Sequence, residues 1–291
     1  MSLVVENCKY QQEEVNYVLV KVFDSRIKQL SDDVEFHYIN IKEFDKGLID
    51  YINENFVRIC KGKNNKSSLD IIKKRAANFF EKKDQRTRNG ATAEFFLHLY
   101  LRSIDYQQEC MFLNMEETSI KKGFDGYYSK ENEEWILESK SGNSKTKGIS
   151  HSSKISEAYA SLKKQLSGDS ENDPWQNAYQ HANSRDVDTS ESIVSILQGF
   201  SDDFISEKFY STENFNILPA ATVFLNGEWK EFDFAELTQK VKNTVKNFEC
   251  KKLMIICCTK KSLELFMDFL GVSIREDNNE SNGKDAINIS E

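Results

Sequence analysis

Two short apolar segments joined by a polar stretch constrain the fold of this chain most strongly. The first is Gly123–Tyr128 and the second is Trp135–Lys140. Such runs are typical of the two strands of a β-hairpin. Side chains on a strand alternate between its two faces, so Glu138 and Lys140 point the same way, and the partner strand brings Asp125 beside them. The pattern therefore predicts two carboxylates and one ammonium group at a single point of a sheet.

These three side chains are of the types that hydrolysis of a phosphodiester requires. The phosphate is anionic and resists attack by hydroxide, so an enzyme supplies divalent cations that neutralise it, orient a water molecule and lower the pKa of that water. Mg²⁺ prefers oxygen ligands and keeps several waters, so one or two carboxylates suffice to hold it. We expect Asp125 and Glu138 to bind Mg²⁺ or Mn²⁺, and Lys140 to orient the attacking water or to stabilise the charge on the phosphate.

The Glu-x-Lys pattern alone is weak evidence, because charged residues make up 30% of the chain. It occurs at four places, which begin at Glu81, Glu138, Glu228 and Glu249. Glu81 stands in a polar run, Glu228 follows an Asn-Gly turn signal and Glu249 closes a helical stretch. Only Glu138 ends an apolar strand that follows an Asp-Gly strand. The alternative interpretation is a solvated ion pair at a strand end, which stabilises a fold little.

A third acid lies upstream, in a segment that is predicted to be a buried helix. Gly90–Leu101 is apolar almost all round, and Glu94 lies inside it. Buried carboxylates are uncommon unless they are paired or bind a metal. Glu94 therefore either pairs with Arg86, Arg88 or Arg102, or joins Asp125 and Glu138 as a metal ligand.

Hydrophobic periodicity predicts alternating strands and helices along the rest of the chain. We expect further strands at residues 16–23, 34–41, 218–225 and 252–259, and further helices at residues 43–60, 68–83, 152–166, 193–204, 234–248 and 262–270. Residues 168–191 are rich in Ser, Asp and Asn around Pro174, which predicts a mobile loop or an insertion. The alternation indicates an α/β layered sheet.

The order of these features resembles the restriction-endonuclease-like, or PD-(D/E)xK, nuclease superfamily. The core of that superfamily is a helix followed by three strands and another helix, with an acid and then an acid-x-lysine at the heart of the sheet. The match covers roughly residues 86–166. The resemblance implies a helix, a three-stranded hairpin region and a helix within a mixed central sheet, with additional N-terminal and C-terminal α/β elements.

More narrowly, the chain resembles the nuclease subunit of the Hachiman anti-phage defence system. The residues that carry this resemblance are Arg88-Asn89-Gly90 leading into Glu94, Gly123–Gly126, and Trp135–Lys140 followed by Ser141-Gly142. Periodicity and composition divide the chain into an N-terminal α/β region at residues 1–85, a nuclease core with C-terminal α/β elements at 86–275, and a polar tail at 276–291 that is predicted to be disordered.

The resemblance also implies roles, cofactors and partners. Carried over by position, the metal-binding acids are Glu94, Asp125 and Glu138, and the catalytic lysine is Lys140. The implied cofactor is Mg²⁺ or Mn²⁺. The implied substrate is double-stranded DNA, and the implied partner is a superfamily 2 helicase in a multi-subunit complex.

The distribution of charge is uneven. The net charge of −8 argues against a protein that binds nucleic acid unaided. However, Lys61–Arg88 holds ten Lys or Arg against three acids, and Lys140–Leu166 holds six lysines against Glu157. These basic segments flank the predicted site in sequence, so we expect them either to face phosphates or to be the cationic outer faces of ordinary helices. The acidic remainder predicts weak binding to DNA by the chain alone, and a partner that grips DNA.

Other features exclude several classes of protein. No run approaches eighteen apolar residues and the first residues lack the pattern of a signal peptide, so we expect a cytoplasmic protein without a membrane span. The six cysteines show no Cys-x-x-Cys spacing and no His companions, which argues against structural zinc. His98 is predicted to be a core residue, and His151 follows the Lys140 segment closely enough to be weighed as a substrate contact.

Two classes of function follow from the sequence. The first is an Mg²⁺-dependent deoxyribonuclease that acts as the effector of a defence complex and is held in check by a helicase partner. The second is a scaffold that docks and regulates a helicase and whose catalytic residues are vestigial. An RNase on the same fold is a third, weaker interpretation.

Overall fold

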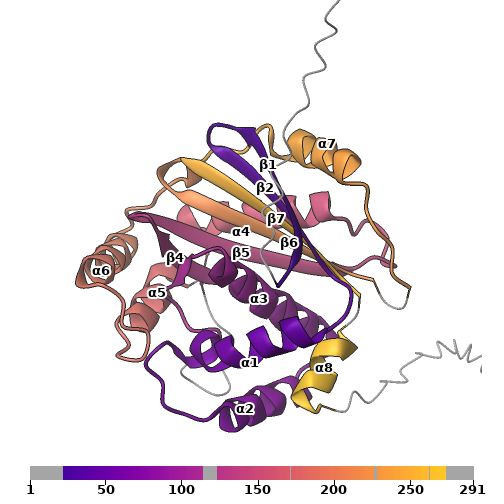
Figure 1. Ribbon diagram of the computed structural model, residues 1–291. Coiled ribbons are helices and arrows are strands. Elements are labelled where there is room, and N and C mark those ends of the chain that lie inside the picture. The colour runs from indigo at the N-terminus through magenta and orange to yellow at the C-terminus, as the bar shows by residue number, and fades with distance from the viewer. Residues whose placement is uncertain (1–21, 114–122, 171, 226–227, 262, 273–291) are drawn as a thin grey trace, which may run out of the picture.

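A seven-stranded mixed sheet forms the centre of the computed structural model, which describes residues 22–113, 123–170, 172–225, 228–261 and 263–272 (Figure 1). The strands lie in the order β1 (Asp24–Ser31), β2 (Val34–Ile41), β7 (Lys252–Lys260), β6 (Asn216–Phe224), β5 (Glu133–Asn143), β4 (Gly126–Lys130) and β3 (Gln107–Gln108). The four central strands are parallel, and the pairs at both edges are antiparallel. The expected α/β class with a mixed central sheet is confirmed.

Helices cover both faces of the sheet, as parallel strands require (Figure 1). One face packs on α1 (Lys46–Lys61), α2 (Leu69–Glu81), α3 (Gln85–Ser103) and α8 (Glu264–Leu270). The other packs on α4 (His151–Leu166), α5 (Pro174–Ala182), α6 (Glu191–Ile205) and α7 (Phe234–Val245). Strand alternation divides β5 between the two cores, because Leu137 lies in the α3 core and Ile136 in the α4 core.

Most of the predicted elements are present. The chain runs from α3 through the three antiparallel strands β3, β4 and β5 into α4, which is the predicted order of helix, three strands and helix. Helix α3 begins at the N-cap Asp84, whose side chain accepts a hydrogen bond from the Thr87 amide at 2.7 Å. Its residues 95–101 are all buried, as the apolar sequence predicts.

The strand predicted at residues 16–23 is wrong for Val22 and Phe23, which precede the first described strand, and residues 16–21 lie outside the described residues. The first described strand, β1, consists of residues 24–31. It pairs only with β2 at the edge of the sheet, and its side chains are largely half-exposed or exposed. An edge strand of this kind lacks the apolar alternation that marks a buried strand. The tail at 276–291 also lies outside the described residues.

The prediction of a loop or insertion at residues 168–191 is wrong in part, because α5 forms there. Asp173 caps the helix through hydrogen bonds from the amides of Trp175 and Gln176, and Pro174 occupies the first helical position. The indole of Trp175 is fully buried. The Ser, Asp and Asn residues that suggest a loop are in part the capping residues of this short helix.

The described part of the region 1–85 contributes strands β1 and β2 to the same sheet as the rest of the chain, and helices α1 and α2 to one of its faces. Strand β2 pairs in parallel with β7 along its whole length, and α1 and α2 share one hydrophobic core with α3 and α8. The division proposed at residue 85 therefore crosses a continuous sheet.

Lysine 260, at the end of β7, is fully buried in the core of the α3 face. Its Nζ atom lies 4.1 Å from the ring centre of Phe96 and 4.5 Å from that of Phe44. Within the described part of the chain, Nζ has no hydrogen-bond partner. Burial lowers the pKa of Lys260 to about 7. The charges of Cys258 and Glu264 act in the other direction and raise this pKa, but burial outweighs them.

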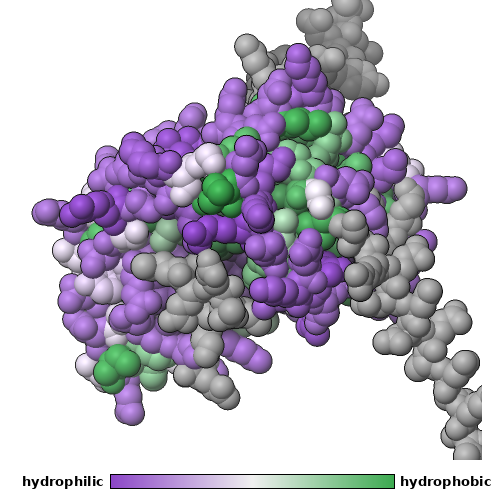
Figure 2. Space-filling view, turned by 90° about the horizontal axis from the view of Figure 1, so that it is seen from below, coloured by the Kyte–Doolittle hydropathy of each residue, from purple (hydrophilic) through white to green (hydrophobic). Residues whose placement is uncertain are grey.

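The surface is mainly polar. Figure 2 shows a largely hydrophilic face, broken by separate hydrophobic areas. Among the residues that the structure describes, the exposed large apolar side chains are Ile71, Ile196, Ile205 and Phe209. None of the described helices combines the length and the apolar character that crossing a membrane requires.

Candidate metal centre

The predicted site lies where β4 separates from β5. Their antiparallel register ends at the pair Gly126 and Leu137, so Asp125 and Glu138 would be the next pair. Beyond this point β5 continues to Asn143 and pairs with β6 only, among the described strands. The amide of Ser139 finds its acceptor in the Asp125 side chain, whose Oδ2 lies 2.7 Å away. This hydrogen bond replaces the missing strand partner and holds Asp125 against β5.

Helix α5 supports the segment that leads into Asp125. Gly123 has a φ of +149°, and a Cβ at this position would lie 3.0 Å from the carbonyl oxygen of Pro174. The Phe124 ring packs edge-on against Trp175 with 4.8 Å between ring centres. The position of Asp125 therefore depends on contacts with α5, in a segment where the sequence predicts a loop.

Glu138 is buried, with 3% of its surface exposed, and its side chain faces α4. Its Oε1 accepts a hydrogen bond from Ser161 Oγ at 2.7 Å and forms an ion pair with Lys140. Its Oε2 accepts a hydrogen bond from Gln165 Nε2 at 3.0 Å. Ser161 and Gln165 are four residues apart, so they lie on the same face of the helix. Three donors therefore fix the orientation of this carboxylate.

The Lys140 side chain lies beside the two carboxylates, on the face of the sheet that α4 covers. About a third of its side chain is exposed, so the ammonium group lies at the border between the core and solvent. Burial acts to lower the pKa of Lys140, but the negative charges of Glu138 and Asp125 outweigh burial and raise that pKa above its ordinary value. The ammonium group is therefore charged at neutral pH.

Glu94 lies on the opposite side of the sheet. Its helix, α3, packs on the face to which Leu137 points, whereas Glu138 points to α4. Glu94 Oε1 lies 3.3 Å from Nε2 of His98, and His98 in turn hydrogen-bonds the buried hydroxyl of Tyr128. Burial raises the pKa of Tyr128, and the charge of Glu94 raises it further.

The structure thus brings together Asp125, Glu138 and Lys140, and it places Glu94 on the helix that packs on the other face of the sheet. Among the described residues, no three His, Cys, Asp or Glu side chains gather closely enough to hold a metal ion. The predicted core position of His98 is confirmed, because its ring is buried and hydrogen-bonded to Tyr128.

Ser161 and Gln165 are functional candidates that the sequence patterns above do not single out. A signal was present, because α4 buries a helical stripe that includes Ile155, Ala158 and Leu162, and Gln165 continues that stripe. A polar side chain at such a position needs a partner. In the structure, that partner is Glu138.

The donor set fits a hard divalent cation. Asp125 and Glu138 offer carboxylate oxygens, which Mg²⁺ and Mn²⁺ prefer. The Oε1 atom of Gln165, next to Glu138, is buried and has no hydrogen-bond partner among the described residues. A buried oxygen of this kind is a further acceptor at the same point.

The sequence matches the model of the HamA family over residues 15–272, which is most of the chain. The chain belongs to the HamA family. This is the family of Hachiman defence proteins, so the anti-phage role implied by the sequence resemblance is supported at the level of the family. No curated protein matches the chain.

The two basic segments of this HamA-family chain lie on opposite faces of the sheet. Helix α2, from the segment Lys61–Arg88, packs in the α3 core, whereas α4 packs in the other core. The two alternatives for the basic segments, contact with phosphates or ordinary cationic helix faces, both stay open as predictions. Among the described residues, the segment Lys140–Leu166 is the one that shares a face with Glu138.

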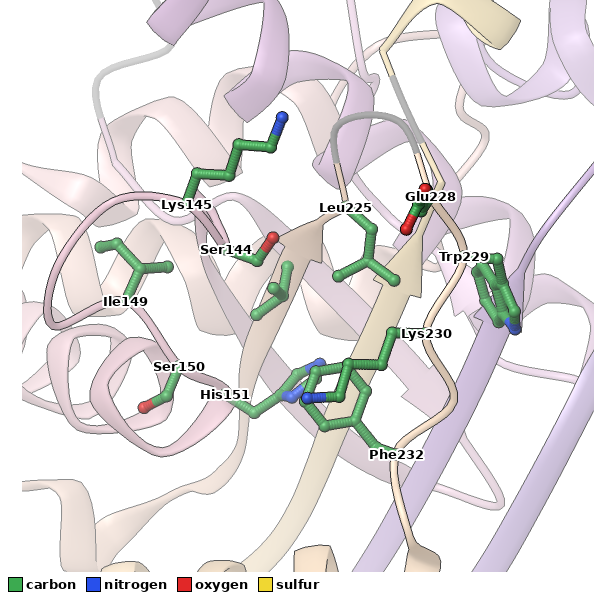
Figure 3. Close-up of a pocket in the computed structure, with 11 residues that line it drawn as sticks. Ser144, Lys145, Ile149, Ser150, His151, Leu225, Glu228, Trp229, Lys230 and Phe232 are labelled. Carbon is green, nitrogen blue, oxygen red and sulfur yellow. The ribbon is translucent and has the colours of Figure 1, made fainter.

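A cavity of about 820 Å³ lies at the carboxyl ends of β5 and β6 in this HamA-family chain (Figure 3). Lys145 and Glu228 border it at one side, and His151 and Phe232 at the other (Figure 3). This edge of a parallel sheet commonly binds ligands. The residues that line it do not include Asp125, Glu138 or Lys140.

His151 is part of the core rather than of an open surface. It is 2% exposed, and its Nε2 lies 3.3 Å from the carbonyl oxygen of Cys258 and 3.2 Å from the hydroxyl of Thr259. Burial lowers its pKa to about 4. The ring is therefore neutral at physiological pH, and these contacts favour a structural role over contact with substrate.

Proposed function

We propose that this HamA-family protein is a metal-dependent deoxyribonuclease that acts as the effector of its defence complex. The observation that carries this proposal is the convergence of Asp125, Glu138 and Lys140 where β4 separates from β5. Two carboxylates and a charged amine at one partly open point match what the hydrolysis of a phosphodiester requires.

Asp125 and Glu138 would hold the cation. When bound, Mg²⁺ or Mn²⁺ neutralises the phosphate and lowers the pKa of a coordinated water. The protein supplies the rigidity of the site, because the Ser139 amide fixes Asp125 while the Ser161 hydroxyl fixes Glu138. Ligands held in this way need little reorganisation on binding.

Lys140 supplies positive charge to the reacting phosphate. Its pKa is raised, so the amine stays protonated and acts by orienting water or stabilising negative charge rather than as a base. In the structure this ammonium group is paired with Glu138. Catalysis requires the ammonium group to turn toward the substrate, a short movement for a side chain with a flexible stem.

Charge supports a partner that delivers DNA. The net charge is −8, and the site face carries a limited basic surface, which includes Lys145, Lys154, Lys163 and Lys164 from the segment around α4. Binding of DNA by the chain alone is therefore expected to be weak and to fall steeply with salt. A helicase of the same defence system that grips DNA and restrains the nuclease until it meets abnormal DNA satisfies this requirement.

The second candidate is a scaffold that docks and regulates a helicase. It is favoured by one observation, which is that both Glu138 oxygens already accept hydrogen bonds from the protein. A hydrogen-bond network of this kind also stabilises the fold of a protein that has no catalytic activity.

The test is a cleavage assay of the chain together with the proteins that co-purify from its native operon. Linear double-stranded DNA and RNA of the same sequence are incubated with Mg²⁺ or with EDTA. We expect loss of intact DNA with Mg²⁺, none with EDTA, and intact RNA. Cleavage of RNA alone, or cleavage that EDTA leaves unchanged, would overturn the proposal. Full activity of the isolated chain would remove the need for restraint by a partner.

A further inference from the structure

The amide of Gln165 is incompletely satisfied beside the most buried carboxylate of the site. Gln165 is 9% exposed, and its Nε2 donates to Glu138 Oε2 at 3.0 Å and to Ser161 Oγ at 3.3 Å. Its Oε1 is buried and has no hydrogen-bond partner in the part of the chain that the structure describes. Leaving such a buried acceptor unsatisfied destabilises the folded protein.

The two ends of this amide have nearly the same shape. Rotation by about 180° around the last side-chain bond exchanges Nε2 and Oε1 without other movement. Without a cation, rotation would place Oε1 against the Glu138 carboxylate, and two acceptors repel each other. Nε2 therefore faces Glu138 in the structure. A divalent cation beside Glu138 reverses this preference, because it attracts both oxygens.

Helices α3 and α4 pack on opposite faces of the sheet. The Glu94 carboxylate is next to His98 on α3, whereas Gln165 reaches Glu138 from α4. An amide oxygen is also neutral, so it adds a ligand without adding a third negative charge to Asp125 and Glu138.

We propose that Gln165 is the third protein ligand of the cation that Asp125 and Glu138 hold, and that its amide rotates to present Oε1 when the cation binds. This inference rests on the proposed function and extends it to a metal ligand from α4. It assigns Ser161 a different part, which is to hold Glu138 through its hydroxyl.

Direct coordination is tested by a spectroscopic signature that a positioning role does not give. Gln165→Cys, in the full-length protein, is titrated with Co²⁺, and a thiolate on Co²⁺ produces a strong near-ultraviolet charge-transfer band. We expect the band in Gln165→Cys and its absence in the wild type, whose native cysteines provide the background. Ala160→Cys, at an exposed position on the same helix, is the matched control and is expected to give no band.

Calorimetry of Mg²⁺ binding provides an independent measurement. Gln165→Leu is expected to weaken Mg²⁺ binding roughly 10- to 100-fold, whereas Gln239→Leu, an exposed control on α7, leaves it unchanged. Far-UV circular dichroism checks folding. If Gln165→Leu does not fold, Gln165→Asn replaces it with the same expected loss, because the shorter side chain withdraws the amide.

The outcomes separate this inference from the proposed function. Wild-type affinity for Mg²⁺ in Gln165→Leu, together with Co²⁺ binding and no band in Gln165→Cys, would overturn the assignment of Gln165 and leave the metal centre standing. A wild-type protein that binds neither Mg²⁺ nor Co²⁺ would overturn both.

Discussion

Replacing Glu138 and Lys140 together by alanine is expected to lower Mg²⁺-dependent DNA cleavage by at least about 10³-fold. The double variant removes one proposed metal ligand and the ammonium group that stabilises charge on the phosphate. Loss of one group that stabilises a transition state costs about 10²–10³ by itself, so the combined loss is at least as large. The measurement is cleavage of linear DNA by the assembled complex, alongside protection of cells from phage.

Two further variants make this result specific. Glu249→Ala with Lys251→Ala removes the same Glu-x-Lys spacing at exposed positions before β7, and we expect it to retain full activity. Because Ser161 and Gln165 lose their partner in the double variant, Glu138→Gln provides a milder change that keeps a polar acceptor for them. A folded double variant that still degrades DNA and still protects cells would show that the chemistry is elsewhere.

Lys260→Met is expected to stabilise the protein by on the order of 3 kcal/mol at pH 7. The charged form of Lys260 is costly, because the side chain is fully buried and its Nζ has no hydrogen-bond partner among the described residues. The rings of Phe44 and Phe96 offset part of this cost through cation–π contacts. Methionine has a similar length and no charge to bury.

The buried Lys260 is expected to make the stability of the folded protein rise with pH. The pKa of Lys260 is about 7 in the folded state and near 10.5 in an ordinary lysine. Between these values the unfolded chain binds the proton and the folded chain does not, so stability rises with pH, by up to about 1.4 kcal/mol per pH unit. Below pH 7 both states are protonated and this contribution becomes constant. Lys260→Met is expected to lack the rise.

Urea unfolding at pH 6, 7, 8 and 8.5 measures this difference between wild type and variant. The range stops below pH 9 because burial raises the pKa of Cys257 and Cys258, and ionisation of these thiols in the unfolded chain lowers stability at higher pH. Lys251→Met, an exposed change next to β7, is the control. Parallel stability curves for Lys260→Met and the wild type would mean that Lys260 is paired in the folded protein.

The sequence predicted the hairpin of the site well because strand alternation is a local property. Glu138 and Lys140 point to one face wherever β5 is placed, and an antiparallel partner brings Asp125 to the same point. The side of the sheet on which Glu94 lies is a property of the whole fold. It depends on which core α3 joins, and no local pattern contains that information.

Short polar elements were harder to predict. Helix α5 is nine residues long and its capping residues resemble those of a loop, so Trp175 was the main signal of a buried helix there. Strand β1 lies at the edge of the sheet and lacks an apolar stripe. In both elements, tertiary contacts decide the structure more than local propensity does.

Buried polar residues were the least predictable part of the site and of the core. Gln165 and Lys260 belong to residue types that usually lie at the surface. Gln165 is buried because it binds Glu138, and Lys260 because β7 ends between α3 and the segment that holds Phe44. Such positions depend on partners that are distant in sequence.

Anomalous scattering from crystals soaked in Mn²⁺ tests the metal centre most directly. We predict a single strong peak between the carboxylates of Asp125 and Glu138, at the point where β4 separates from β5. The peak should disappear in Glu138→Ala with Lys140→Ala. The absence of a peak at a Mn²⁺ concentration that supports DNA cleavage, or a peak confined to another part of the protein, would contradict the assignment of this site.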